Sequence, residues 1–325
     1  MLRIVPATGE CLQPALELLF SEWPADARAQ RIVEIHQEIE DEEFDPQDLL
    51  LAEIDDQLVG VQLTILRDDD VGMVWPPVVD RPLLKRMSGP VGEVIEDELL
   101  AEAARQLDAE DAWIGQALLE PNQSREHAAM QRNGFLRMTE LRFFERSLTR
   151  SSSLAKRAKA SPWSYETFHR TKNRLAFVNV LEATFRGSLD CPELNGVRDG
   201  QQSLKNHEAA GSSQPDRWRM YRRAGVDVGI LLMTERPDQQ AWEVLYLGVL
   251  ESARGCGIGR AMLLDALDAA RDANVERLLI VADTRNIPAV SLYESLDFQP
   301  VATRVAFVRL ADRLPRDRPH DAARQ

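Results

Sequence analysis

Three glycines alternate with other residues in one short segment of the second half of the chain: Gly255, Gly257 and Gly259. Because glycine carries no Cβ, such a segment can turn sharply and bring its backbone N–H groups close to a ligand. An apolar stretch at 245–250 precedes the glycines, and 260–273 follows them with apolar residues at helical spacing. The sequence therefore predicts a strand, a tight turn and a helix N-terminus, whose unpaired N–H groups would form a site for phosphate.

Two familiar phosphate-binding loops do not fit this segment. A P-loop has Lys and then Ser or Thr after its last glycine, whereas Arg260 and Ala261 follow here. The dinucleotide-binding fingerprint has the spacing Gly-x-Gly-x-x-Gly, whereas this segment has Gly-x-Gly-x-Gly. On this segment alone, a glycine-rich turn that binds no ligand remains an alternative.

The composition is that of an ordinary globular protein. The chain has 325 residues, which is enough for two domains with a core each. Its formal net charge of −14 argues against binding to nucleic acid or to an anionic membrane, and is compatible with cationic amines as substrates. The three cysteines are widely separated and lack metal-ligand spacing, so we expect a reducing compartment and no metal site. Nothing in the sequence indicates an oligomeric state.

Neither a transmembrane span nor a signal peptide is expected. No apolar run reaches the length that crosses a bilayer, and the first residues lack the basic start and apolar core of a secretory signal. We therefore expect a cytoplasmic protein.

The order of predicted elements is of the α/β (α+β) kind and occurs twice. In each half a strand and helices precede a run of mostly antiparallel strands, a longer helix, a further strand, a short helix and a last strand. Residues 149–162 are polar, basic and small, which predicts a linker, and 313–325 predicts a polar tail. We therefore expect two domains, at 1–148 and 163–312, each with a mixed, mostly antiparallel sheet flanked by helices.

The two copies are not chemically equal. The segment from Met130 to Phe135 aligns with that from Tyr293 to Phe298, so a thioether stands where the second copy has a phenol. At the position of the glycine turn the first copy has residues 85–92, in which Pro90 lacks a backbone donor and the glycines are wrongly spaced. The first domain is therefore expected to be non-catalytic and to shape the substrate cleft or an interface.

Two segments of the second half resemble signatures of the GNAT N-acetyltransferases. Val249 followed by Arg254 and the glycine turn is similar to the acyl-CoA-binding signature, Arg/Gln-x-x-Gly-x-Gly/Ala after a strand that ends near a Val. The second signature, Asn-x-x-Ala-x-x-Leu-Tyr-x-x-x-Gly-Phe, is matched by Asn286, Ala289, Leu292, Tyr293 and Phe298. Asp297 replaces its Gly, and Asp tolerates left-handed backbone better than most residues. The resemblance covers about 225–310 and implies tandem GNAT-like domains.

The resemblance implies acetyl-CoA as the acyl donor. In this family the strands beside the turn splay apart, and the pantetheine arm enters between them. Backbone groups at 247–250 would bind the arm and polarise the thioester carbonyl, while N–H groups at 255–260 would hold the pyrophosphate. Asn286 would contact the cofactor and also cap a helix. The implied cofactor-binding residues are Leu247, Val249, Leu250, Arg254, Gly255, Cys256, Gly257, Ile258, Gly259, Arg260 and Asn286.

Direct acyl transfer needs a neutral amine and a proton donor for the leaving thiolate. Tyr293 matches the family's general acid, and a buried structural tyrosine is the alternative. Glu243 lies six positions before Val249, as does the general-base Glu of the histone-acetyltransferase branch. Strand alternation would place it on one face with Leu245, Leu247 and Val249, and a surface glutamate is the alternative.

The loop at 187–198 is expected beside the acceptor pocket. Asp190 and Glu193 would hold a cationic amine there, or they would cap or solvate a helix. A small amine, an amino acid or thiol–sugar conjugate, or a peptide N-terminus would each fit as the acceptor. The sequence thus predicts an acetyl-CoA-dependent N-acetyltransferase whose C-terminal domain is catalytic. A non-enzymatic acyl-CoA-binding sensor and an interaction module are the alternatives.

Overall fold

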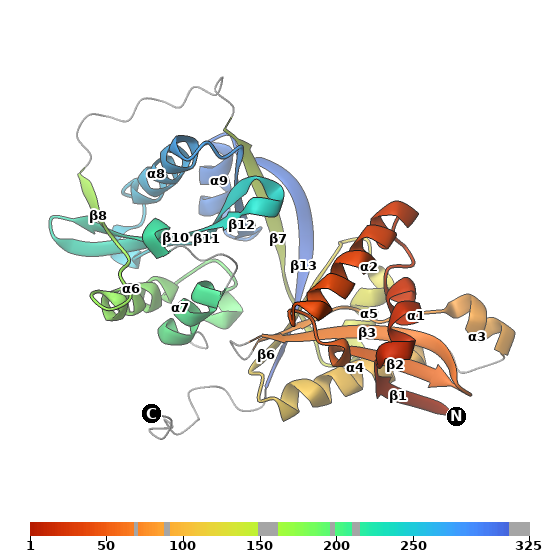
Figure 1. Cartoon of the computed structure of the whole chain (residues 1–325). Coiled ribbons are helices and arrows are strands. Elements are labelled where there is room, and N and C mark those ends of the chain that lie inside the picture. Colours follow the sequence, from red (N-terminus) through yellow and green to blue (C-terminus); the bar gives the residue numbers. More distant parts are fainter. Residues whose placement is uncertain (68–70, 88–91, 149–161, 196–198, 210–214, 312–325) are drawn as a thin grey trace. The chain divides into compact units, whose positions relative to one another are not determined.

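The computed structural model of the chain describes residues 1–67, 71–87, 92–148, 162–195, 199–209 and 215–311. They form two compact units: unit 1 is Met1–Arg137 together with the stretch from Val305, and unit 2 is Met138–Arg304. Each unit is a mixed, mostly antiparallel sheet flanked by helices (Figure 1), which confirms the predicted fold class. The predicted linker and the predicted tail, 313–325, lie outside the described residues, except for Pro162.

Unit 1 has helices on both faces of its sheet (Figure 1). Its elements are β1 (Leu2–Pro6), α1 (Gly9–Leu19), α2 (Ala25–Glu40), β2 (Leu49–Ile54), β3 (Gln57–Arg67), β4 (Val71–Val74), β5 (Val78–Val79), α3 (Arg81–Met87), α4 (Gly92–Ala109), β6 (Ile114–Leu119), α5 (Ser124–Arg132) and the second half of β13 (Gln299–Leu310). The strands β1 to β4 pair antiparallel in sequence order, and β4 pairs parallel with β6. β2 and β3 form a hairpin, because Asp55 and Asp56 turn between them with φ of 52° and 61°.

Unit 2 contains the glycine turn. Its elements are β7 (Leu136–Ser147), β8 (Trp163–Thr167), α6 (Arg174–Phe185), α7 (Gly200–Ala209), β9 (Arg219–Arg223), β10 (Val226–Arg236), β11 (Ala241–Val249), α8 (Ile258–Asp272), β12 (Arg277–Asp283), α9 (Ile287–Glu294) and the first half of β13. Strand order is β7-β12-β11-β10-β9-β8, and only β11 and β12 run parallel within this run. Helices α8 and α9 pack on one face of the sheet and α6 on the other (Figure 1), over separate apolar cores.

Two strands depart from the expected continuous halves. β7 follows α5 of unit 1 in sequence, yet it pairs with β12 from Leu141↔Asp283 to Ser147↔Arg277. The end of β13 pairs with β6 from Val305↔Leu119 to Leu310↔Ile114. The compact units therefore differ in these strands from the stretches 1–148 and 163–312. No local pattern could reveal this exchange, because a strand's alternation fixes its buried face and not the identity of its neighbour.

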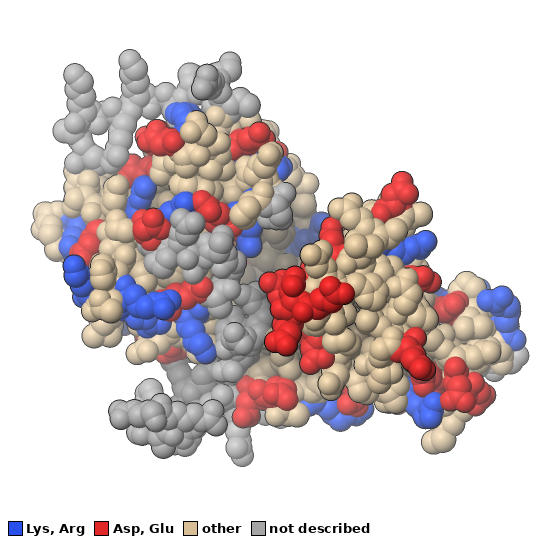
Figure 2. Space-filling model, viewed as in Figure 1, with Lys and Arg blue, Asp and Glu red and all other residues tan. Residues whose placement is uncertain are grey.

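Acidic side chains gather over α2 on the face of the molecule that Figure 2 shows. Asp41, Glu42 and Glu43, which follow this helix, are exposed, which is typical of a solvated acidic face. No helix in the described part of the chain is long and apolar enough to cross a membrane.

Candidate active site

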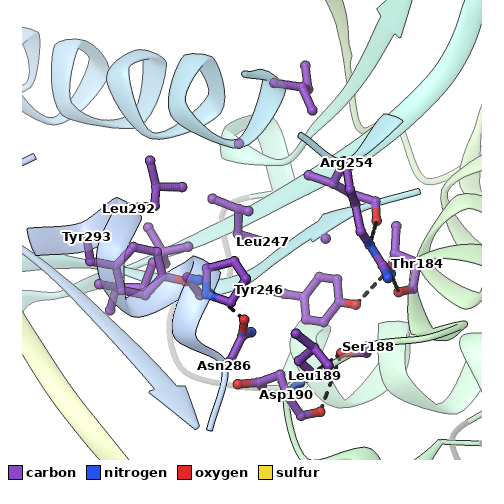
Figure 3. Close-up of a pocket in the computed structure, with 18 of the residues that line it drawn as sticks. Thr184, Ser188, Leu189, Asp190, Tyr246, Leu247, Arg254, Asn286, Leu292 and Tyr293 are labelled. Carbon is purple, nitrogen blue, oxygen red and sulfur yellow. Dashed lines mark hydrogen bonds between the residues drawn. The ribbon is translucent and has the colours of Figure 1, made fainter. Parts of the chain in front are cut away.

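The parallel strands β11 and β12 separate halfway along their length. They pair only from Ala241↔Arg277 to Val244↔Ile280. Beyond this point β11 continues along β10 to Val249, whereas β12 continues along β7. A cavity of about 540 Å³ lies where they part, between the turn before α8, the start of α9 and the loop after α6 (Figure 3). The predicted gap beside the glycine turn is thus present.

The turn before α8 presents backbone N–H groups to this cavity. Gly255 and Gly257 have φ of 74° and 83°, conformations that favour glycine. None of the N–H groups of residues 255–260 donates a hydrogen bond to another described residue, and no side chain caps the helix. The amides therefore meet the cavity together with the positive end of the α8 dipole, which is the arrangement that binds phosphate.

Gly259 leaves the mouth of the cavity open. A Cβ at this position would lie 3.4 Å from Leu292 Cδ2 and 3.9 Å from Leu247 Cδ2, across the mouth of the cavity. A larger residue would therefore narrow the cavity beside the exposed amides.

Most of the predicted cofactor-binding residues line the cavity. They are Leu247, Val249, Arg254, Gly255, Gly257, Ile258, Gly259, Arg260 and Asn286. Leu250 and Cys256 do not line it. The Leu250 N–H donates to Val228 O at 2.9 Å on β10, and Cys256 is exposed. The expected contacts of these two residues with the acyl donor find no support in the geometry, and the roles of the other nine stay predictions.

Glu243 lies outside the cavity because β11 contains a β-bulge. Tyr246 pairs with Leu232 on β10, but Val244 pairs with the adjacent Met233, so Leu245 is an extra residue. One extra residue reverses the alternation of faces along the strand. The expectation that Glu243 shares a face with the residues beyond the bulge is therefore wrong.

The packing on the two faces agrees with this reversal. Before the bulge Val244 packs in the core below α8, and after it Leu247 and Val249 do. Glu243 is on the opposite face, where its carboxylate accepts a hydrogen bond from Arg236 Nε at 2.6 Å. The candidate base is thus engaged in an ion pair on the α6 side of the sheet.

Tyr293 lines the cavity from α9. The Asn286 side chain caps this helix by accepting from the Ala289 N–H at 3.3 Å, as predicted. The Tyr293 ring packs edge-on against Phe144, and its side chain is 5 % exposed. Burial, reinforced by the charge of Asp190, raises the pKa of the Tyr293 hydroxyl well above its usual range. The hydroxyl therefore keeps its proton at neutral pH.

The loop after α6 brings Asp190 to the cavity. Asp190 lines it with Ser188 and Leu189 (Figure 3), and one of its carboxylate oxygens accepts the Asp283 N–H at 2.9 Å. Glu193 is outside the cavity, where it forms two hydrogen bonds to the Arg285 guanidinium at 2.6 and 2.9 Å. Of the two predicted acceptor residues, only Asp190 is therefore beside the cavity.

Asp283, at the end of β12, anchors this loop. It is fully buried and accepts from the Thr139 hydroxyl at 2.7 Å, from the Cys191 N–H at 3.1 Å and from Arg285. Burial by itself would raise the pKa of Asp283, but the hydrogen bonds from Arg285, Thr139 and Cys191 hold it below its usual range. The carboxylate is thus ionised and fixes the backbone on which Asp190 is carried.

Tyr246 and Thr184 also line the cavity, and the sequence interpretation missed both. The Thr184 hydroxyl donates to Leu181 O at 2.6 Å, so the Tyr246 hydroxyl is the donor in the 2.8 Å hydrogen bond between the two side chains (Figure 3). The available signal was Gly248, where a Cβ would lie 2.5 Å from the Tyr246 ring. A tyrosine two residues before a glycine is too common on apolar strands to predict that the tyrosine ring packs over the glycine.

The second half of the chain is similar to known proteins. Residues 188–298 match the model of the acetyltransferase (GNAT) family. A relative named mycothiol acetyltransferase, from Acidothermus cellulolyticus, is 40 % identical over 67 residues, which are 21 % of this chain and 20 % of that protein. The chain thus matches only a fifth of the length of this relative.

Two solved structures share the fold along nearly the whole chain. A GCN5-related N-acetyltransferase from Sphaerobacter thermophilus has a TM-score of 0.61 at 14 % identity, with 95 % of each chain covered. A tandem GNAT protein from the clavulanic acid biosynthesis pathway has a TM-score of 0.52 at 15 % identity, with 96 % of this chain and 99 % of that chain covered. At such identities the likeness establishes the fold alone.

Proposed function

Because residues 188–298 match the model of the GNAT acetyltransferase family, we propose that unit 2 is an acetyl-CoA-dependent N-acetyltransferase acting by direct acyl transfer. One observation carries the proposal: the N–H groups of residues 255–260 lie beside a cavity and donate to no other described residue. A row of open amides at a helix N-terminus suits a diphosphate. The cavity that continues between β11 and β12 suits the extended arm attached to it.

The open edge of β11 would hold that arm and the acyl group. The Leu250 N–H points to β10. Successive residues of an antiparallel strand direct their N–H and C=O groups to opposite sides of the strand. The groups of Leu247 and Val249 therefore face the gap. Val249 O already accepts from Arg254 Nε at 3.1 Å, which leaves the Val249 N–H and both groups of Leu247 for the donor. Acetyl-CoA would supply the activated thioester.

Proton transfer would be divided between two side chains at the cavity. Tyr293 is buried, keeps its proton, and would donate it to the departing thiolate. Asp190 is the carboxylate of the cavity lining, and it replaces Glu243 as the group we expect to receive the ammonium form of the acceptor. The Asp190 carboxylate would hold the amine near the acyl group and accept its proton, directly or through water, which makes the amine a nucleophile.

The acceptor is proposed as a small-molecule amine or a peptide N-terminus. The name of the relative, mycothiol acetyltransferase, adds the amine of a thiol–sugar conjugate to the acceptors worth testing. The acidic net charge supports a cationic acceptor and disfavours nucleic acid as a partner. A cytoplasmic location and the absence of membrane attachment stay part of the proposal.

Calorimetry with acetyl-CoA and a thiol-release assay over a panel of amines test the proposed function. We expect binding, and release of free CoA that requires both an amine and Tyr293. Binding without turnover on any amine would instead support an acyl-CoA-binding sensor. No binding at all would leave only an interaction module and would refute the proposal.

A further inference from the structure

The side chain of Arg254 donates four hydrogen bonds to backbone carbonyl groups. Nε donates at 3.1 Å to the carbonyl oxygen of Val249, which is the last residue of β11. Nη1 donates to Gly187 O at 2.6 Å, and Nη2 donates to Arg186 O at 2.8 Å and Thr184 O at 3.3 Å. The head of the side chain is thus turned towards the end of α6 (Figure 3), although its own backbone begins the turn with the open amides.

Helix α6 needs such a partner. The last carbonyl groups of a helix accept no hydrogen bond from within the helix, and the C-terminal end of the helix carries partial negative charge. The last turn of α6 contains no basic residue of its own. Arg186 follows as the C-cap, and Arg254 supplies hydrogen-bond donors to these carbonyl groups from a segment 67 to 70 residues away in sequence.

The same contacts fix where the acceptor loop begins. We use this name for residues 187–195, of which Ser188, Leu189 and Asp190 line the cavity. Gly187 has φ of 59°, and a Cβ there would lie 3.3 Å from Arg254 Nη1. The first residue of the acceptor loop therefore contacts the Arg254 guanidinium, so a movement of the guanidinium would shift the loop.

We propose that Arg254 is a positioning residue that couples the acyl-donor turn to the acceptor loop, so that donor binding orders the acceptor side of the cavity. The inference deepens the proposed function and rests on it for the identity of the donor. Binding at residues 255–260 would restrict a glycine-rich backbone whose first neighbour is Arg254. Once its backbone is restrained, Arg254 loses less conformational entropy when its side chain binds the four carbonyl groups. Donor binding and order in the acceptor loop are then coupled through conformational entropy.

Arg260 provides a matched contrast on the same turn. It also lines the cavity, but its Nη1 donates to the Ser295 hydroxyl at 2.8 Å near α9, and it has no hydrogen-bond partner on α6 among the described residues. An arginine at the N-terminal end of α8 is placed to pair with phosphate. Replacement of Arg260 should therefore affect donor affinity, whereas replacement of Arg254 should affect order in the acceptor loop.

Hydrogen exchange with mass spectrometry tests the coupling in the full chain, with acetyl-CoA as the probe. Without ligand, Arg254→Ala should speed amide exchange of peptides within 184–195 by about fivefold or more, because their anchor is lost. Saturating acetyl-CoA should slow exchange there in the wild type and not in Arg254→Ala. The acetyl-CoA Kd should change by less than about threefold in Arg254→Ala and by about fivefold or more in Arg260→Ala.

Gly187→Ala loosens the same contact from the other side, so it serves where Arg254→Ala fails to fold. It should reproduce the faster exchange and the lost response to acetyl-CoA. Unchanged exchange at 184–195 in both variants would overturn the inference, as would a larger loss of donor affinity in Arg254→Ala than in Arg260→Ala. Absence of acetyl-CoA binding by the wild type would refute the proposed function instead, while the comparison without ligand still judges the anchor.

Discussion

The two units end corresponding helices with the same backbone device but present different side chains from it. In unit 1 the Phe135 N–H donates to Met130 O at 3.0 Å around Gly134, which has φ of 82°. In unit 2 the Phe298 N–H donates to Tyr293 O at 3.1 Å around Asp297, which has φ of 58°. A bond that spans five residues around a left-handed position closes both α5 and α9. Both units therefore fix the same backbone position, at which unit 1 carries the thioether of Met130 and unit 2 the phenol of Tyr293.

The parallel strand pair differs between the units in a second way. In unit 1 β4 stops at Val74, and Trp75 is followed by two prolines, which have no N–H to offer. A Cβ at Gly72 or at Gly115, on the two parallel strands, would lie 2.0 or 2.7 Å from the Leu107 side chain. Leu107 thus packs against the strands of unit 1, whereas the strands of unit 2 part around a cavity. This supports a non-catalytic first unit.

Replacement of the phenol should break the comparison most clearly. Tyr293→Phe keeps the ring that packs on Phe144 and removes only the hydroxyl. We expect CoA release to fall about 10²- to 10⁴-fold, because the leaving thiolate loses its proton donor. The acetyl-CoA Kd should stay within about threefold, since binding would depend on the amides of the turn.

Met130→Leu is the matched change in unit 1. It should leave CoA release unaltered and lower the free energy of unfolding by less than about 1.5 kcal/mol, because the two side chains have similar volumes. Turnover of Tyr293→Phe within tenfold of the wild type would show that Tyr293 is a structural tyrosine, like its counterpart.

The second comparison uses two glycines of nearly equal geometry. Gly257 and Gly134 have φ of 83° and 82°, and a Cβ at either would meet nothing within 4 Å. Alanine should therefore cost about 1 kcal/mol of unfolding free energy at both positions, from backbone strain alone. Only Gly257→Ala should weaken acetyl-CoA binding, by about tenfold in calorimetry, because relief of the strain reorients the amides of the turn. An equal effect of Gly134→Ala on binding would contradict the assignment.

Much of unit 2 could be predicted because its devices are local. A glycine turn, a helix cap at Asn286 and a left-handed Asp297 each depend on residues a few positions apart, and the structure contains all three. The separation of β11 and β12 came with the family resemblance and is also present.

The remainder depends on contacts that local sequence does not encode. The extra residue Leu245 is an ordinary apolar residue on an apolar strand, so nothing marked the bulge that turns Glu243 away. The family resemblance placed Arg254 among the cofactor-binding residues, yet its guanidinium donates to carbonyl groups 67 or more residues away. The exchange of β7 and β13 is of the same kind, since only tertiary pairing reveals it.

One carboxyl group in each unit should make stability depend on pH, and the two dependences should have opposite signs. In unit 1 burial, with a smaller contribution from the charge of Asp45, raises the pKa of Asp48 to about 6. A carboxyl group with a raised folded-state pKa binds its proton more tightly in the folded protein. Its contribution to stability is therefore fully present below the unfolded-state pKa of about 3.9 and is lost as pH rises through about 6. In unit 2 the lowered pKa of Asp283 has the opposite consequence, with stability lost as pH falls below about 4.

Chemical denaturation between pH 7 and pH 3 measures both trends. Solvent screens the partly buried Asp48, so we expect a gain of about 1 kcal/mol between pH 7 and pH 4.5. Asp48→Asn should abolish this gain and leave the loss at lower pH, which Asp283 causes. A gain of the same size in Asp48→Asn would assign it to another group.

The smallest effect concerns the left-handed residue itself, where two contributions oppose each other. Asp297→Gly removes the strain of a side chain at positive φ, which is worth about 0.5 to 1 kcal/mol for a residue of this type. It also removes the carboxylate that lies 3.6 Å from the Nη2 of Arg146, a buried guanidinium whose pKa is lowered by desolvation. That carboxylate is largely exposed, so the pair contributes about 0.5 kcal/mol.

The two contributions should nearly cancel, so the free energy of unfolding of Asp297→Gly should lie within about 0.5 kcal/mol of the wild type. Gly134→Asp in unit 1 introduces the strain, and no described ion pair involves position 134 to offset it, so it should cost about 1 kcal/mol. Urea unfolding of both variants decides the matter. A clear stabilisation by Asp297→Gly would mean that Arg146 does not need this partner, and that the aspartate at the end of α9 is retained for a reason other than the stability of the helix end.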